Sequence, residues 1–347
     1  MELAPLLHAV VQLGASDLHL KVASPPMVRV NGELKPLDGP ELTSEDVRRA
    51  LESLTDAAQR QVFDSNWELD FSYQLADEVR FRVNAARERS RTSLSFRLIP
   101  LRVPDLPSLG LPPICSTLAM KRRGLVLVTG PTGSGKSTTL AAMIDHLNHA
   151  EARRIVTIED PIEYLYRDDR SVVTQRELGT DTRSFALAAR QALRQDPDVL
   201  LVGEMRDAET IAACLTAAET GHLVLSTLHT NSGPQTIDRI VDVFPPHQQS
   251  QIRMQLSLTL EAVLAQLLLP RADLTGRVAA MEVMLATPAI RNLIREGKTH
   301  QMGSVIQTGA QFGMQTMDQS LTELVRSGIV ARAVAEEHAA SPESLRV

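Results

Sequence analysis

The feature that most constrains this chain is a glycine-rich segment at 130–137. Its sequence, GPTGSGKS, matches the pattern G-x-x-x-x-G-K-[ST], and the apolar run LVLVT comes directly before it. The residues after it place four apolar side chains on one helical face, namely Leu140, Met143, Ile144 and Leu147. A strand, a glycine loop and a helix in this order form a loop whose backbone amides surround phosphate oxygens. The segment therefore predicts a nucleotide-binding core.

The residues of this loop divide the binding of a nucleotide such as ATP among them. Glycines let the backbone amides turn inward, and the N-terminus of the following helix adds its dipole. We expect Lys136 to reach the β and γ phosphates, where it also serves catalysis, and Ser137 to ligate Mg²⁺. The predicted nucleotide-binding residues of the loop are Gly130, Pro131, Thr132, Gly133, Ser134, Gly135, Lys136, Ser137 and Thr138.

A second apolar run, DVLLVGE, ends at Glu204. A carboxylate at the end of a strand beside a phosphate loop holds Mg²⁺ directly or through water. Glu204 is therefore predicted to ligate Mg²⁺, to help bind the nucleotide and to act in catalysis. The alternative is a strand-end glutamate that faces solvent.

A third apolar run, RIVTIED, leads into an acidic cluster of Glu159, Asp160 and Glu163. In a doubly wound sheet the carboxyl ends of the strands face the ligand, so these carboxylates are expected at the same edge. We favour Glu163 as the general base that orients the attacking water. The alternative is that Glu159 and Asp160 serve as helix caps or form ion pairs.

Two histidines frame a fourth apolar run, with His222 at its start and His229 at its end. Either histidine has the chemistry to sense the γ phosphate or to bridge subunits. We place His229 among the catalytic residues and His222 among the nucleotide-binding residues. The alternative for both is a histidine that is merely hydrogen-bonded in the core.

Near-continuous apolar runs separated by helices indicate a parallel sheet that is covered on both faces. Residues 114–347 are therefore predicted to form an α/β domain, with a helical region at about 288–347. The first 99 residues contain alternating patterns, an Asn31-Gly32 turn and a helix capped by Ser44. They predict an α+β domain with an antiparallel sheet and helices on one side. Five prolines within 100–113 predict a stiff linker between the two domains.

Composition excludes several classes of protein. The net charge of −6 and an aromatic content of 3% argue against a protein that coats nucleic acid. Two cysteines are too few for a disulfide framework or a four-cysteine zinc site, so both are read as buried apolar residues. The apolar run at 262–269, interrupted by Gln266, is too short to cross a membrane. Acidic Glu2 follows Met1 in place of a signal-peptide pattern, and the chain is expected to be cytoplasmic.

Along nearly its whole length the sequence resembles the PilT family of type IV pilus retraction ATPases, within the secretion ATPase superfamily. The AIRNL segment at 289–293 is the most telling match, because it distinguishes retraction motors from pilus assembly ATPases. The matching stretches are ASDLHL at 15–20, RFRVNA at 80–85, GPTGSGKST at 130–138, IEDPIEYLY at 158–166, RQDPDVLLVGEMRD at 194–207, TGHLVLSTLHT at 220–230 and AIRNLIREGKTHQM at 289–302.

The resemblance implies a RecA-like P-loop NTPase core with a PAS-like N-terminal domain, assembled as a homohexameric ring that uses ATP and Mg²⁺. In such rings each core binds ATP against the neighbouring subunit's N-terminal domain. Arginines of that domain reach across to the γ phosphate, and the RFRVNA match gives this role to Arg80 and Arg82. The alternative for Arg80 and Arg82 is a charged strand face that is exposed to solvent. Arg97 and Arg194 are weaker candidates for the arginine that reaches the γ phosphate.

The resemblance also implies a motor that rotates N-terminal domains against cores and powers pilus retraction. Its expected partners are the pilus platform protein of the inner membrane, where the ring is peripheral, and an assembly ATPase or retraction paralogue. A pilus-extension or type II secretion ATPase is the nearest rival, although such relatives usually carry a tetracysteine zinc element. A nucleic-acid translocase is disfavoured by the acidic charge. A structural ring without turnover is disfavoured by Lys136, Glu163 and Glu204.

Overall fold

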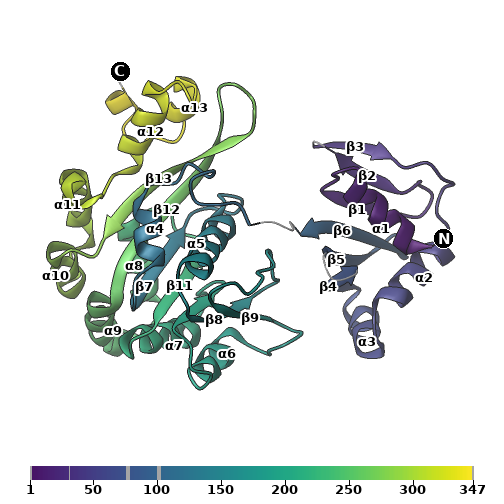
Figure 1. Ribbon diagram of the computed structural model, residues 1–347, viewed down its shortest axis with the longest axis horizontal. Coiled ribbons are helices and arrows are strands. Elements are labelled where there is room, and N and C mark those ends of the chain that lie inside the picture. Colours follow the sequence, from purple (N-terminus) through teal and green to yellow (C-terminus); the bar gives the residue numbers. More distant parts are fainter. Residues whose placement is uncertain (1, 31, 76–78, 100–102, 346–347) are drawn as a thin grey trace. The chain divides into compact units, whose positions relative to one another are not determined.

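The computed structural model describes residues 2–30, 32–75, 79–99 and 103–345 (Figure 1). The chain divides into two compact units. The first is Met1–Arg102 with Glu163–Leu165, and the second is Val103–Ile162 with Tyr166–Val347. The predicted turn residue Asn31 and the first residues of the predicted linker, 100–102, lie outside the described residues.

The first unit is an antiparallel sheet with helices on one face. Its strands follow the order β3-β2-β1-β6-β5-β4 and all pair antiparallel. The elements are α1 (Leu3–Gln12), β1 (Asp17–Leu20), β2 (Met27–Val30), β3 (Glu33–Pro36), α2 (Ser44–Leu54), α3 (Ala57–Asn66), β4 (Glu68–Leu75), β5 (Val79–Glu88) and β6 (Arg91–Ile99). Helix residues such as Leu7 and Val47 share one buried cluster with Phe81 and Phe96 of the sheet. The predicted arrangement is confirmed.

The start of α2 corrects the predicted cap. Thr43, not Ser44, is the capping residue: its hydroxyl accepts from the Asp46 amide, and the Asp46 carboxylate accepts from the Thr43 amide. Ser44 is the first helical residue. The reciprocal bonds satisfy two amides at the helix start, which a cap at Ser44 would not do. Helices α1 and α3 were not predicted; Phe63 is the buried residue that α3 contributes, so its apolar pattern is weak.

The second unit contains a mixed, mostly parallel sheet in the order β13-β12-β7-β11-β10-β8-β9. Its strands pair in parallel, except that β13 pairs antiparallel with β12. The strands are β7 (Gly124–Thr129), β8 (Arg154–Glu159), β9 (Val172–Glu177), β10 (Val199–Val202), β11 (Leu223–Leu228), β12 (Leu260–Pro270) and β13 (Arg277–Leu285). Strands β9, β12 and β13 were not predicted. The apolar run at 262–269 is part of β12, which lies next to β7.

Helices cover both faces of this sheet, as predicted (Figure 1). Helices α6 to α11 pack in one buried cluster with Leu125 and Leu127, whereas α4 and α5 pack in the other with Val126 and Val128. The helices are α4 (Ile114–Ala119), α5 (Lys136–Ala150), α6 (Phe185–Ala192), α7 (Ala208–Glu219), α8 (Gly233–Asp242), α9 (Pro246–Thr259), α10 (Pro288–Glu296), α11 (Met302–Thr308), α12 (Met317–Arg326) and α13 (Arg332–Glu336). The segment after Pro288 is helical, as predicted.

The prediction that both cysteines are buried apolar residues is confirmed. Cys115 and Cys214 are buried, and burial raises the pKa of both thiols to about 12. They therefore stay protonated and behave as small apolar residues. No helix in the described part of the chain is long and apolar enough to cross a membrane.

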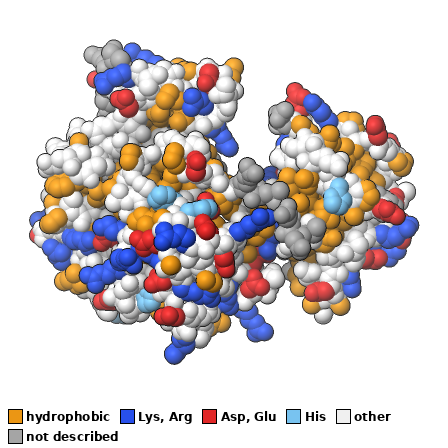
Figure 2. Space-filling model, in the orientation of Figure 1, with side chains coloured by type: hydrophobic (Ala, Val, Ile, Leu, Met, Phe, Trp, Pro, Cys, Tyr) orange, Lys and Arg blue, Asp and Glu red, His pale blue; other side chains and the backbone are white. Residues whose placement is uncertain are grey.

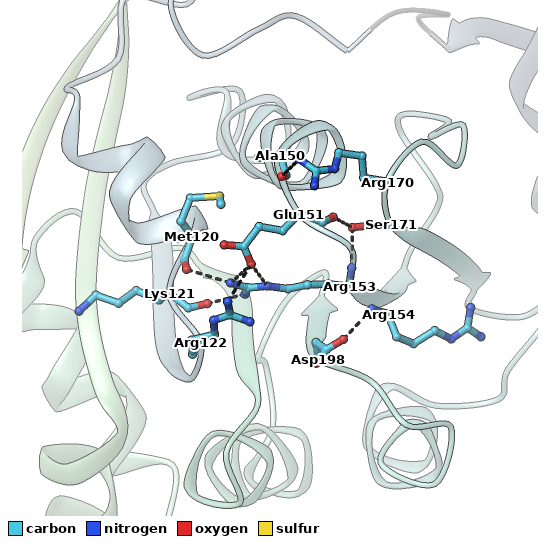
Figure 3. A network of polar contacts seen from close by, with 10 residues as sticks. All are labelled: Met120, Lys121, Arg122, Ala150, Glu151, Arg153, Arg154, Arg170, Ser171 and Asp198. Carbon is cyan, nitrogen blue, oxygen red and sulfur yellow. Dashed lines mark hydrogen bonds and ion pairs between the residues drawn. The ribbon is translucent and has the colours of Figure 1, made fainter.

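A buried arginine closes the amino edge of the large sheet (Figure 3). The side chain of Arg153 is 2% exposed and donates to the carbonyl oxygens of Met120 at 3.0 Å and Lys121 at 2.6 Å. Its guanidinium also pairs with the Glu151 carboxylate, with nitrogen to oxygen distances of 2.6 and 2.7 Å. These bonds join the loop before β7 to the loop before β8.

We expect Arg153→Ala to lower the free energy of unfolding by about 2–4 kcal/mol, because it leaves two carbonyls and a carboxylate without their charged donor. Chemical denaturation of the full chain measures the change. Arg122→Ala is the matched control: Arg122 is 81% exposed and lies 3.7 Å from the same carboxylate, so its removal changes stability little. Equal effects of the two substitutions would contradict this assignment.

Candidate nucleotide-binding site

The glycine loop leaves the end of β7 and enters α5 with a backbone that requires glycine. Gly130 has a φ of +141° and Gly135, which caps α5, a φ of +87°. A Cβ atom at Gly130 would lie 2.2 Å from the carbonyl oxygen of Gln266. At Gly133 a Cβ atom would meet nothing within 4 Å, so the loop is open on that side. The predicted strand, loop and helix are present in this order.

The loop curls around the ammonium group of Lys136. Its Nζ donates to the carbonyl oxygens of Gly130 at 2.9 Å and Pro131 at 3.0 Å. The first amides of α5 have no acceptor within the helix, and the helix dipole adds positive potential there. The hydroxyls of Thr129 and Ser134 are buried without a hydrogen-bond partner among the described residues. Unsatisfied donors of this kind fit the oxygen atoms of a bound phosphate.

Parallel pairing brings further polar groups to this edge of the sheet. Glu204 follows the end of β10 and His229 follows the end of β11, beside the loop that follows β7. His229 Nε2 lies 3.3 Å from Glu204 Oε2, and the other carboxylate oxygen pairs with Arg206. The Glu204 side chain is 15% exposed. Glu204 and its two partners border a cavity of about 710 Å³ that is also lined by Thr230, Asp238 and Arg239.

The oxygen donors present fit Mg²⁺ better than a transition metal. Ser137 is half-buried in the first turn of α5, and Glu204 supplies a carboxylate. Within the described ranges, no group of three His, Cys, Asp or Glu residues is placed to hold a metal ion. Mg²⁺ takes few protein ligands and completes its shell with water and phosphate oxygens.

Two other predicted acidic residues, Glu159 and Glu163, differ in their surroundings. Glu159, at the end of β8, accepts from the Thr157 hydroxyl at 2.6 Å and from the Gln175 amide at 3.2 Å. Glu163 is exposed and groups with the first unit, in Glu163–Leu165. The general-base role of Glu163 stays a prediction.

The structure does not bring His222 to the phosphate loop of its own chain. Its backbone oxygen accepts from the Gly124 amide at 3.0 Å, at the start of β7, whereas the loop follows the end of that strand. The His222 ring nitrogen Nδ1 lies 2.9 Å from the Ala217 carbonyl oxygen. His222 and His229 stand at opposite ends of β11, and the nucleotide-binding role of His222 stays a prediction.

Arg80 and Arg82 lie on one side of β5, where they alternate with buried Phe81 and Val83. The alternation agrees with the predicted common face. Arg82 is 48% exposed and its Nε lies 4.0 Å from Asp70 Oδ1, a loose contact that leaves the guanidinium accessible. The role of both residues in a neighbouring subunit stays a prediction.

Two contacts of the second unit were not anticipated. Gln266 is buried against the phosphate loop, and its one sequence signal is that it interrupts the apolar run of β12. Within the AIRNL segment, Arg291 donates to the carbonyl oxygens of Ser257 and Leu258 at the end of α9. Arg291 also pairs with Glu261 at 3.1 Å. The motif thus contains a residue that caps a neighbouring helix.

Comparison with known proteins places the chain in a family. Residues 2–338 match the family model described as type II/IV secretion system protein. The chain is 48% identical to the "Type IV pilus retractation ATPase PilT" of Pseudomonas aeruginosa, over 99% of this chain and 100% of that protein. The chain belongs to the PilT family. The resemblance inferred from the sequence is thereby confirmed.

Other members of the PilT family show how far the likeness extends. The "Type IV pilus ATPase PilU" of Pseudomonas aeruginosa is 41% identical over 100% of this chain and 91% of that protein. A crystal structure of the pilus retraction motor PilT with bound ADP superposes with a TM-score of 0.92 and 46% identity. It covers 99% of this chain and 98% of the other.

We expect Lys136→Ala to weaken binding of ATP and to abolish its hydrolysis, because it removes the positive charge that faces the β and γ phosphates. Phosphate release and calorimetric titration with ATP measure the two effects. Lys298→Ala removes an exposed lysine that pairs with Glu296, and it should leave both unchanged. Wild-type hydrolysis in Lys136→Ala would refute the site.

Proposed function

We propose that this chain is the ATP-hydrolysing motor of type IV pilus retraction, which powers twitching motility as a homohexameric ring. The observation that carries the proposal is full-length likeness to PilT together with an intact phosphate loop and the Glu204–His229 pair at one sheet edge. In this proposal the second unit is a RecA-like core and the first a PAS-like domain, joined by the proline-rich linker.

Residues of the core and Glu163 each have a part in the chemistry of ATP hydrolysis. Lys136 exchanges the carbonyl oxygens of Gly130 and Pro131 for phosphate oxygens when nucleotide binds. Ser137 and Glu204 hold Mg²⁺, which when bound neutralises charge on the phosphates. Glu163 accepts the proton of the attacking water, and His229 positions Glu204 through their contact at 3.3 Å.

The ring places Arg80 and Arg82 of one subunit at the nucleotide of the next. An arginine supplied by a neighbour stabilises charge that develops on the phosphates in the transition state. The accessible position of Arg82 on β5 supports this role. Hydrolysis then depends on the orientation of the N-terminal unit. This dependence couples ATP hydrolysis to rotation of one domain against the other.

We place the ring in the cytoplasm, at the inner membrane, where the pilus platform protein is its partner. An assembly ATPase or a retraction paralogue is a further partner. Nucleic acid is not a partner in this proposal: the net charge is −6, and acidic and basic side chains intermix on the face that Figure 2 shows. The chain has two cysteines, which are too few for the tetracysteine zinc element that many extension and type II secretion ATPases carry.

The function is tested by pilus retraction in a strain that lacks its own retraction ATPase. The full chain should restore retraction, and Glu163→Gln should not, because it slows hydrolysis by about 10²–10⁴-fold while nucleotide still binds. Calorimetric titration with ADP checks the binding. If the unaltered chain is expressed and does not restore retraction, the proposed function is wrong. If Glu163→Gln hydrolyses ATP at the wild-type rate, the general base is Glu159 or Asp160 instead.

The role of the arginines is tested by mixing two inactive chains. The double variant Arg80→Ala and Arg82→Ala lacks the donor, and Lys136→Ala lacks a competent core. Mixed rings contain some interfaces that pair an intact core with an intact donor, so part of the ATPase rate should return. Demonstrably mixed rings without any recovery would exclude donation between subunits.

A further inference from the structure

A buried glutamine on β12 holds the phosphate loop from outside the motif. Gln266 is 3% exposed. Its Nε2 donates to the carbonyl oxygen of Ser134 at 2.7 Å, and its Oε1 accepts from the Thr139 hydroxyl at 2.7 Å. Ser134 belongs to the loop and Thr139 to α5, so one side chain ties the loop to the helix that follows it.

The backbone around Gln266 supports the loop as well. Ala265 pairs with Thr129, the last residue of β7, so Gln266 comes level with the start of the loop. A Cβ atom at Gly130 would lie 2.2 Å from the Gln266 carbonyl oxygen, and one at Gly135 would lie 2.9 Å from its Nε2. The loop therefore rests against the same residue near both of its ends.

The hydrogen bond to Ser134 fixes the direction of a peptide group. In a trans peptide unit the carbonyl and the N–H point in opposite directions. Because Gln266 holds the Ser134 carbonyl, the Gly135 N–H of the same unit points away from Gln266. Glycine at 135 has no Cβ to resist rotation of this unit. The side chain of Gln266 thus determines whether the loop presents a donor or an acceptor there.

We propose that Gln266 is a positioning residue for the nucleotide, which keeps the Gly135 N–H directed at the phosphates. The inference rests on the proposed function in that a nucleotide is the ligand, and it adds a residue 132 positions beyond Ser134. Without Gln266 the unit can turn its carbonyl toward the phosphate oxygens, and an attractive contact becomes a repulsive one.

The test compares Gln266→Met, which keeps the length of the side chain but removes its amide, with the unaltered full chain. Calorimetric titration with Mg²⁺ and ADP should show binding weaker by about ten- to a hundred-fold, as a displaced binding group produces. The KM for ATP should rise by a similar factor while kcat changes less. Amide hydrogen exchange across 130–136, measured without nucleotide, should become faster.

The matched control is Leu269→Ala on the same strand. Leu269 is 1% exposed and packs in the buried cluster that contains Val278 and Leu321, away from the loop. The Leu269→Ala substitution should lower the unfolding temperature and leave the affinity for ADP unchanged. A Gln266→Met chain with a lowered unfolding temperature and wild-type ADP affinity would overturn the proposal.

A second variant covers the case in which Gln266→Met fails to fold. Thr139→Val removes the hydroxyl that orients the Gln266 amide and keeps the shape of the side chain. Several-fold weaker ADP binding supports the proposal, and wild-type affinity overturns it. ADP affinity is measured without the pilus, so the two proposals can fail separately. If the unaltered chain does not restore retraction but ADP binding still depends on Gln266, the proposed function is wrong and the role of Gln266 is supported.

Discussion

Parallel pairing of β7 with β11 on one side and β12 on the other governs the nucleotide edge of this molecule. Thr129 is level with Leu228 and with Ala265, so the residues directly after these three positions lie at the same height. Gly130, His229 and Gln266 are those residues. A shift of one position in either pairing would reverse the side chains of a strand and separate the group. The loop, the Glu204–His229 pair and the support from Gln266 all depend on this register.

The two edges of the large sheet differ in how their polar groups are satisfied. At the amino edge, Arg153 pairs with Glu151 and donates to the carbonyl oxygens of Met120 and Lys121, and the Asp198 carboxylate accepts from the Arg154 amide (Figure 3). At the carboxyl edge, the amides of the first turn of α5 have no carbonyl acceptor within the helix. The hydroxyls of Thr129 and Ser134 there are buried without a hydrogen-bond partner among the described residues. The polar groups of the amino edge therefore stabilise the fold, whereas those of the carboxyl edge can bind a ligand.

The sequence predicts the phosphate loop better than the strands that support it, for physical reasons. The loop at 130–137 is a local pattern whose chemistry requires glycine, lysine and serine at fixed spacing, so it predicts its own conformation. Gln266 contacts that loop across 132 residues, and an isolated amide in an apolar strand has no comparable pattern. The position of His222 depends on strand direction, which places it at the opposite end of β11 from His229. Apart from Gln266, residues 262–269 of β12 are all apolar, and periodicity alone does not distinguish such a run from a buried helix.

The contact between Gly130 and Gln266 has a consequence for the order in which the protein is made. Synthesis proceeds from the N-terminus, and the phosphate loop leaves the ribosome long before the strand that supports it. Strand β7 acquires its second parallel neighbour only when residues 260–265 of β12 have emerged. A nascent chain that ends before β12 contains the complete motif and lacks the backbone against which Gly130 rests. The chain therefore gains stability from bound nucleotide only late in synthesis, after the strand that supports the loop has been made.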